Sequence, residues 1–291
     1  MIVTFTLRGE TMTSFSRSTQ LLLFAVLFPL SAVGADAQAD TASIRQRMES
    51  NQQLVARKLI ATSDDAERSR LVAQIGNIRV AAMIPELRAS VTGALRRENV
   101  VQRDRARRAR NGEVLGDQFD AELYLRLVEI VVGFGDPENI DALAGAVRTG
   151  GRALNGIADF GAQAVPALLA AIEADSANPD LVSGALHALR YIVEEHREEI
   201  PASQRVKMRA LTMARLHSPQ RFESTVVAAV ELALADGSPA LRSRVISLRD
   251  RPAQAFTAGA GDTGREDALR RRIEARLRGE PALPLRKRTR T

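Results

Sequence analysis

Histidines and carboxylates are the residues that could do chemistry in this chain, which has three histidines and no cysteine. One of them, His196, is flanked on both sides by glutamates that together could attract a cation: Glu194, Glu195, Glu198 and Glu199. A tight metal site needs further ligands that converge from a second helix. So loose a motif is typical of many solvated helix ends. We therefore interpret this cluster as a charged helix C-terminus and predict no metal site.

Catalytic motifs are missing from the sequence. Nothing has the spacing of a glycine-rich phosphate loop, a zinc-protease helix or a nucleophile elbow. The pair Asp64-Asp65 follows Ser63 at the start of a predicted helix, where negative charge is favourable to the helix dipole. The absence of cysteine excludes disulfides, thiolate zinc sites, iron–sulfur clusters and thiol nucleophiles. We predict no catalytic residue and no cofactor, although carboxylates distant in sequence could still meet in a groove and form a hydrolase site.

Arginines are concentrated between residues 96 and 110, where seven of them stand against Glu98 and Asp104. The ordinary interpretation of such a charge run is a flexible, solvated connection between helices. The alternative is an anion- or partner-binding patch, because arginine forks suit phosphate and carboxylate. The candidate binding residues here are Arg103, Arg105, Arg107, Arg108 and Arg110.

A second basic stretch begins at Arg265. Leu269, Ile273 and Leu277 form a narrow apolar stripe on a predicted arginine-rich helix. Such a helix could close the end of a repeat array, or it could lie on an anionic membrane surface. The tail beyond it adds three candidate binding residues: Arg286, Lys287 and Arg288.

The N-terminal region has the layout of a secretory signal peptide. An apolar run from Leu21 to Leu30 follows Arg17 and precedes a small-residue segment with Ala35 and Ala37 in an A-x-A pattern. The run is shorter than the roughly 20 residues of a bilayer span. We expect cleavage and an exported protein, periplasmic or extracellular, with no transmembrane segment in the mature chain. Export and the lack of aromatic residues among the arginines argue against nucleic acid as a partner.

Composition and periodicity predict an all-α fold. Apolar residues make up 45% of the chain but aromatic residues only 4%, so that helices packed through Ala and Leu are favoured over β-sandwiches. Apolar positions recur at three- and four-residue spacing, which places one stripe on each helix. The stripes begin at Ile84, Ile140, Val165, Val182 and Phe222, and the segment from Leu123 to Phe134 is apolar around most of its circumference.

Helix boundaries are marked by glycine, aspartate, asparagine and proline. Gly135-Asp136-Pro137 is typical of a C-terminal glycine, an N-cap aspartate and a proline in the first helical turn. Comparable breaks occur at 150–151, 178–180, 218–219 and 237–239. Because the connections are short, we expect successive helices to be antiparallel neighbours.

Several helix starts look alike, among them Ile140-Asp141-Ala142-Leu143 and Val165-Pro166-Ala167-Leu168. These segments resemble HEAT-like repeats, including the short repeats first described in bilin lyases, over about half of the mature chain. The best matches are 135–147, 161–172, 179–193 and 239–248, although Ser183 stands where many such repeats have an arginine. The resemblance implies an irregular α-solenoid of antiparallel helix pairs, HEAT- or armadillo-like, and it slightly favours a lyase among the enzyme alternatives.

We therefore predict five segments: a signal peptide (1–37), a HEAT-like helical domain (38–250), a linker (251–264), a basic C-terminal helix (265–280) and a disordered basic tail (281–291). The predicted function is that of a non-enzymatic binding or scaffold protein of the cell envelope, whose groove binds a protein partner. The alternatives are peripheral binding of anionic envelope surfaces through the arginine clusters and an enzyme with its site in the groove.

Overall fold

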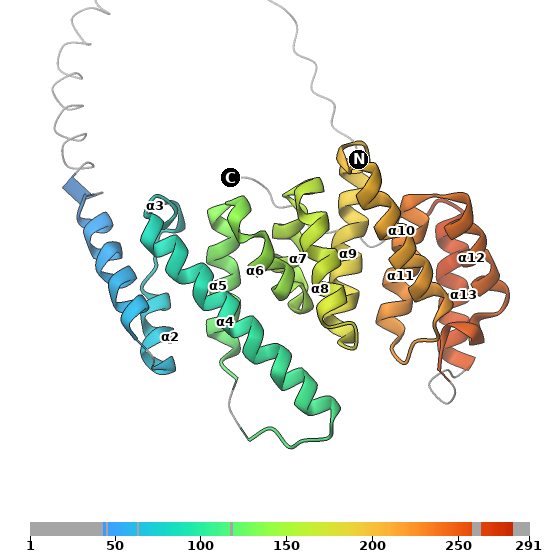
Figure 1. The fold of residues 1–291 in the computed structure, drawn as a ribbon, viewed down its shortest axis with the longest axis horizontal. Coiled ribbons are helices and arrows are strands. Elements are labelled where there is room, and N and C mark those ends of the chain that lie inside the picture. The colour runs from blue at the N-terminus through green and yellow to red at the C-terminus, as the bar shows by residue number, and fades with distance from the viewer. Residues whose placement is uncertain (1–42, 45, 63, 117–118, 258–262, 282–291) are drawn as a thin grey trace, which may run out of the picture. The chain divides into compact units, whose positions relative to one another are not determined.

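A computed structural model describes residues 43–44, 46–62, 64–116, 119–257 and 263–281 (Figure 1). These described residues are 82% helical and contain no strand, which confirms the predicted all-α class. By its contacts the chain divides into a unit of residues 1–51 and a unit of residues 52–291, and the second unit contains all of the helices labelled α2 to α13. The predicted signal peptide, 1–37, and the basic tail from 282 lie outside the described residues.

The helices of this second unit differ strongly in length, from the 26 residues of α4 to the five of α3. Four of the short 3₁₀ turns directly adjoin an α-helix, and the fifth lies between α12 and α13. After helical residues 52–61 the elements are α2 (Asp65–Ala73), α3 (Ile78–Ala82), α4 (Pro85–Arg110), α5 (Ala121–Phe134), η1 (Pro137–Asn139), α6 (Ile140–Ala146), η2 (Val147–Thr149), α7 (Gly151–Ala158), η3 (Gly161–Ala164), α8 (Val165–Ala174), α9 (Pro179–His196), η4 (Arg197–Glu199), α10 (Ala202–His217), α11 (Glu223–Asp236), α12 (Pro239–Asp250), η5 (Pro252–Ala255) and α13 (Thr263–Leu277).

The predicted helix boundaries occur where the turn residues stand. Gly135 ends α5 in the left-handed conformation, with φ 62°, which costs glycine little because it has no Cβ. Asp136 then caps η1 by accepting a 3.0 Å hydrogen bond from the backbone N–H of Glu138. Asn178 caps α9 in the same way, accepting from the N–H of Leu181. Local chemistry therefore accounts for these starts and stops.

Helix packing follows the order of the chain. The helices pack in consecutive pairs: α4 on α5, α6 on α7, α8 on α9, α10 on α11 and α12 on α13. In addition α4, α6, α8, α10 and α12 touch one another in that order, and so do α5, α7, α9, α11 and α13. Figure 1 shows the helices from α4 onward succeeding one another in this sequence. Most connections are short, as predicted, such as the one from Asp236 of α11 to Pro239 of α12, but the connection from Arg110 of α4 to Ala121 of α5 is longer.

The core consists of the predicted apolar stripes. Leu87, Val91 and Leu95 of α4 are fully buried, as are Leu168 of α8 and Leu186 of α9. Burial of one such side chain stabilises the fold by roughly 1.5–3 kcal/mol. Alanines such as Ala142, Ala185 and Ala229 are buried among these larger side chains, and small side chains allow helices to pack closely.

Two apolar residues do not lie where the stripes place them. The periodicity predicts that Phe222 begins the stripe of α11, but it is the N-cap residue, in extended conformation, and it is 45% exposed. Leu125 is also exposed, by 55%, so that α5 shows one open side although most of its other apolar residues are buried. A residue that precedes the first helical turn no longer follows the 3.6-residue period.

Glycines permit the closest approach between helices. A Cβ on Gly184 of α9 would lie 2.8 Å from the carbonyl carbon of Val147, which is a backbone atom of η2. A Cβ on Gly156 of α7 would lie 2.7 Å from a methyl group of Val132 of α5. Any larger residue would therefore force these helices apart.

Part of the predicted linker 251–264 is packed. Pro252–Ala255 form the turn η5, and both Ala255 and Phe256 are buried. Gln220 N–H donates to the carbonyl oxygen of Ala255 at 2.8 Å, and its own carbonyl oxygen accepts from Thr257 N–H at 3.1 Å. These contacts fasten the segment to the α10–α11 connection.

No individual helix in the described part of the chain is both long and apolar enough to cross a membrane. The pair 151–158 and 161–174 meets that criterion jointly, across a bend of 117°.

Candidate binding groove

A groove of about 380 Å³ crosses three alternate helices of the fold, α4, α6 and α8. One wall is the middle of α4, the floor is α6 with η2, and the other wall is α8 with the first residues of α9. We call it the α4–α8 groove. Its lining includes Val100, Arg103, Gly145, Arg148, Ala170 and Asp175.

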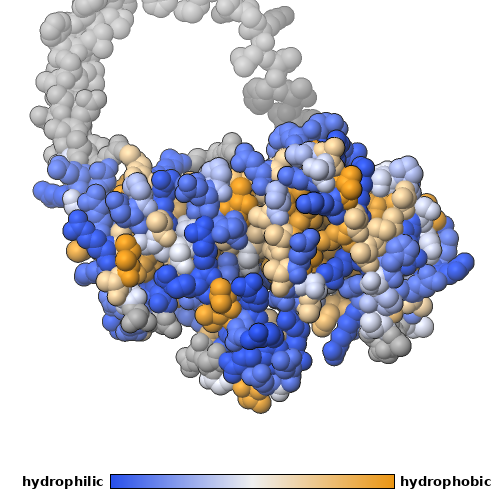
Figure 2. All heavy atoms as spheres, viewed as in Figure 1, coloured by the Kyte–Doolittle hydropathy of each residue, from blue (hydrophilic) through white to orange (hydrophobic). Residues whose placement is uncertain are grey.

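The floor of the groove is formed by a short helix and a glycine. The floor helix α6 has only seven residues, while α4 beside it has 26. On the floor, a Cβ at Gly145 would lie 2.6 Å from the side-chain nitrogen of Asn99, so only glycine lets α4 and α6 come this close. Figure 2, drawn from the same side as Figure 1, shows weakly hydrophobic surface between hydrophilic side chains on the face turned toward the viewer.

The α8 wall consists of alanines that do not belong to the core stripe of that helix. They lie on the side opposite to Leu168 and Ile172 and are partly or fully exposed: Ala167, Ala170, Ala171 and Ala174. Alanine covers little of the backbone, so it leaves room above the helix for side chains of a ligand.

A row of polar contacts fixes the α4 wall to η1 and α6. Thr92 donates to the side-chain oxygen of Asn139 at 2.8 Å, and this pair is buried. One turn further along α4, Arg96 forms a two-pronged ion pair with Asp141, with distances of 2.9 and 2.8 Å. Asn99 comes next and donates to the carbonyl oxygen of Ala142 at 2.7 Å. Their spacing places all three on one face of α4.

Ionisation of the wall residues reflects these contacts. The hydrogen bonds from Arg96 lower the pKa of Asp141, and the same contact raises the pKa of Arg96. Burial raises the pKa of Tyr124, whose hydroxyl donates to Asn99, to about 12. Near neutral pH Asp141 is therefore negatively charged, Arg96 is positively charged and Tyr124 is neutral.

The far end of the groove is closed by a second ion pair. Arg110, the last residue of α4, donates to Asp175 at 3.2 Å. Asp175 is 8% exposed and also accepts from the amide of Asn178 at 3.0 Å. The end of α4 is in this way attached to the turn between α8 and α9.

The arginine cluster is not a flexible connection, because all of its residues belong to α4. Arg, Ala, Gln and Glu are good helix formers, and the sequence 96–110 is rich in them. Most of its arginines have partners of their own: Arg107 pairs with Asp104, Arg108 with Glu113 at 2.8 Å and Arg110 with Asp175, while Arg105 lies 5.9 Å above the ring of Phe119.

Arg103 differs from these neighbours. Its side chain is exposed and lines the groove, and no ion pair holds it within the described part of the chain. The tail candidates Arg286, Lys287 and Arg288 lie outside the described residues, so their part in a binding surface stays a prediction.

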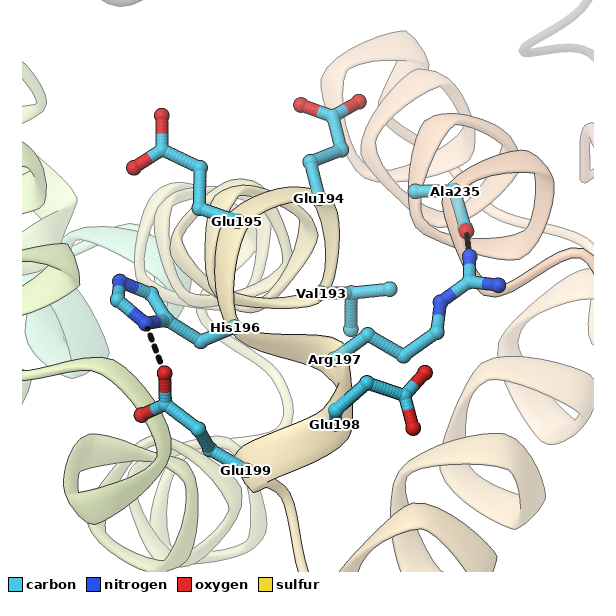
Figure 3. A pocket seen from close by; sticks show the side chains of 8 residues that line it. All are labelled: Val193, Glu194, Glu195, His196, Arg197, Glu198, Glu199 and Ala235. Atoms are coloured by element: carbon cyan, nitrogen blue, oxygen red, sulfur yellow. Dashed lines mark hydrogen bonds and ion pairs between the residues drawn. The ribbon is translucent and has the colours of Figure 1, made fainter.

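The glutamates around His196 border a separate open pocket of about 460 Å³ at the end of α9 (Figure 3). His196 Nδ1 lies 2.9 Å from Glu199 Oε1, whereas Glu195 and Glu198 point in other directions. Arg197 in the same stretch donates to the carbonyl oxygen of Ala235. In the described ranges no three histidine or carboxylate side chains are placed to hold a metal ion.

A buried charge network joins α9, α11 and α13, and no pattern in the sequence indicates it. Glu231 of α11 is 1% exposed and contacts two arginines of α13, Arg272 at 3.0 Å and Arg276 at 2.8 Å. Arg276 also lies 3.6 Å from Glu194 of α9, which in turn accepts from the buried Arg190. The inward arginines of α13 thus attach this helix to its neighbours.

His187 lies near the same network, half-buried on α9. Burial, and then the charge of Arg190, lower its pKa to about 4. It is therefore neutral at pH 7, and a neutral imidazole with so low a pKa is a weak base.

Comparisons with protein-family models, with curated proteins and with solved structures gave no match for this chain.

Proposed function

We propose that this chain is a non-enzymatic binding protein that holds a segment of a partner protein in the α4–α8 groove. We further propose that it is exported to the cell envelope and that its helices form an irregular α-solenoid of the HEAT or armadillo type. The observation that carries the binding function is the groove itself, with its alanine wall on α8 and the charged side chains of Arg103, Asp141 and Arg148. Concave sites of about 300–1,000 Å³ with a few placed polar groups are typical of ligand binding.

The order of helix contacts supports the solenoid. Contacts between alternate helices, such as α4 with α6 and α5 with α7, are those expected when helix pairs stack one upon the next. Each stripe of the sequence is buried only when the next pair is in place. A concave surface over several pairs is the usual consequence of such stacking.

An enzyme in this groove has less support. Its two lining carboxylates, Asp141 and Asp175, are each held by an arginine, Arg96 and Arg110. A paired-carboxylate hydrolase needs one carboxyl group that keeps a proton near neutral pH, and the pKa of Asp141 is lowered instead. No residue of the groove has the surroundings of a nucleophile.

The alternative of binding to an anionic envelope surface rests on the arginine clusters. Pairing with carboxylates removes much of the net charge that the cluster on α4 offers. Co-sedimentation with phosphatidylglycerol vesicles tests this alternative, since attraction through exposed arginines falls steeply with added salt. Binding that does not change with salt would eliminate it.

Export rests on the apolar run Leu21–Leu30 and the small residues after it. Expression of the full chain, with subsequent N-terminal sequencing, is the direct measurement. We expect a mature protein that begins after Ala37 and is found outside the cytoplasm. An uncleaved protein in the cytoplasm would contradict the proposed export, but it would not bear on the proposed binding in the groove.

Groove binding is tested by site-specific photo-crosslinking in the producing cell. A benzophenone residue at Ala170, an exposed position of the groove, should capture the same partner segment as one at Val100 on the opposite wall. The control is Ser243, which is exposed on α12 and does not line the groove. Capture at Ser243 but at neither groove position would refute the proposal.

A further inference from the structure

We propose that the partner segment in the α4–α8 groove is acidic: its glutamate or aspartate side chains bind Arg103 and Arg148, and its apolar side chains lie on the alanines of α8. This inference rests on the proposed function and states the chemistry of the occupant.

The charges that line the groove do not balance. Three arginines and two aspartates face it, and Arg96 is neutralised by Asp141. The other aspartate, Asp175, is neutralised from outside the groove by Arg110. Arg103 and Arg148 therefore remain without a carboxylate partner among the described residues. An occupant with carboxylates would restore the balance.

Arg148 carries this argument furthest, because its charge is partly removed from water. Its Nη2 donates to the neutral amide oxygen of Gln102 at 2.8 Å, while its Nη1 is buried and has no acceptor among the described residues. Gln102 is itself 3% exposed, and its amide nitrogen likewise lacks an acceptor there. A buried donor without an acceptor destabilises a protein, and an uncompensated positive charge does so more strongly. Arg148 also lines the groove, so a carboxylate bound there would place a counter-charge beside its guanidinium.

The apolar side of the groove fits a peptide. Val100 is 54% exposed between Arg96 and Arg103 on α4, and it faces the alanine wall of α8 across the short helix α6. A single partner side chain such as leucine could fill the space above the alanines and also cover Val100. Positive charge on α4 and η2 and apolar contact on α8 fit an acidic, amphipathic segment.

A peptide is favoured over a lipid surface because of the groove's form. Arg103 and Arg148, the groove's two arginines without a carboxylate partner among the described residues, line a hollow. Three arginines near the end of α4 are instead paired with Asp104, Glu113 and Asp175. A flat anionic bilayer would contact the side chains that protrude from the surface before those inside the groove. A peptide is narrow enough to enter the groove and contact Arg103 and Arg148.

The test uses three fluorescein-labelled peptides with one Ala/Leu body, bearing Glu, Gln or Lys at the same positions. Anisotropy titration of the full chain should show that the Glu peptide binds at least about tenfold more tightly than the Gln peptide, since each charge-assisted hydrogen bond is worth about that factor. The Lys peptide should bind least.

Variants identify the residues responsible. Arg103→Gln should weaken binding of the Glu peptide several-fold and leave the Gln peptide unchanged, and Arg148→Gln should do so more strongly. The matched control is Arg242→Gln, which removes an exposed arginine of α12 that no ion pair holds within the described residues and should have no effect. Circular dichroism verifies that each variant keeps its helices. Because Arg103 is exposed, its variant decides the case if Arg148→Gln unfolds.

Each outcome has a distinct meaning. Equal binding of the Glu and Gln peptides, with capture at Ala170 intact, overturns the acidic preference but leaves the proposed function standing. Tightest binding of the Lys peptide overturns it as well. Failure of all three peptides together with failure of the groove crosslink overturns both. Binding of phosphatidylglycerol vesicles that depends on Arg103, without peptide binding, overturns the acidic peptide and assigns the arginines to lipid headgroups instead.

Discussion

Gly184→Ala is expected to destabilise the fold although alanine is the better helix former. Gly184 lies inside α9, where the change by itself would stabilise the helix by about 1 kcal/mol. The new Cβ would stand 2.8 Å from the carbonyl carbon of Val147, whereas carbon atoms pack best at about 3.5–4.0 Å. Because the neighbour is backbone, it cannot rotate away, and α9 must move from η2 by about 1 Å.

Overpacking costs about 1–3 kcal/mol, and a rigid backbone neighbour this close favours the upper part, about 2–3 kcal/mol, so that we expect a net loss of about 1–2 kcal/mol. Gly93→Ala provides the matched control, because Gly93 is also inside a helix but its new Cβ would meet only the flexible end of Arg97, at 3.7 Å. That substitution should stabilise the protein by about 0.5–1 kcal/mol.

Thermal denaturation monitored by circular dichroism at the helix band measures both. For a unit of this size each kcal/mol shifts Tm by about 2–4 °C, so Gly184→Ala should lower Tm by about 2–8 °C and Gly93→Ala should raise it slightly. If both variants shifted Tm in the same direction, the close contact between α9 and η2 would be refuted.

The contacts predict three further outcomes. Glu231→Ala leaves two arginines of α13 without their buried carboxylate, and urea denaturation should show a loss of about 3 kcal/mol or more; an unchanged midpoint would mean that the network is not formed. The pKa of His187 is about 4 in the folded chain, below its ordinary value of 6.5, so the unfolded chain binds the extra proton between these values, and stability should be full above pH 6.5 and fall as the pH is lowered toward 4. The variant His187→Gln should flatten that dependence, and an equally steep profile would show that another group causes it. Tyr124→Phe removes the hydroxyl that donates to Asn99 and should cost about 1 kcal/mol. It should also abolish the phenol absorbance change that titrates near pH 12, which ultraviolet titration detects.

Periodicity and cap residues are enough to predict the helices, because both signals are local. Leu87, Val91 and Leu95 are buried as their spacing requires, and Gly135 adopts the left-handed conformation that ends α5. The prediction for Phe222 is wrong because this residue stands one position before the helix begins, where the period does not yet apply.

The groove could not be predicted, since it depends on contacts between residues far apart in sequence. Arg110 meets Asp175 across 65 positions, and nothing in the arginine run distinguishes it from Arg103, which has no such partner among the described residues. The close approach of α6 to α4 in the groove depends equally on Gly145, which lies against Asn99. Only the three-dimensional arrangement separates a structural arginine from an available one.

The charge network at Glu231 escapes prediction for a related reason. A single glutamate among the alanines of α11 resembles a solvent-exposed position, and the arginines of α13 resemble a solvated basic face. A pattern of sequence reports which face of a helix is polar, but it does not report that two polar faces meet.

Because each helix contacts mainly helices one or two positions away along the chain, the stability of this unit is a sum of local contacts between neighbouring helices. Amide hydrogen exchange should accordingly be slowest in α9, which packs against α7, α8 and α11. Exchange should become faster toward the first and last helices of the unit. Fraying of a terminal pair would leave the middle intact, so a truncated product that retains α4 to α11 could persist as a folded remnant.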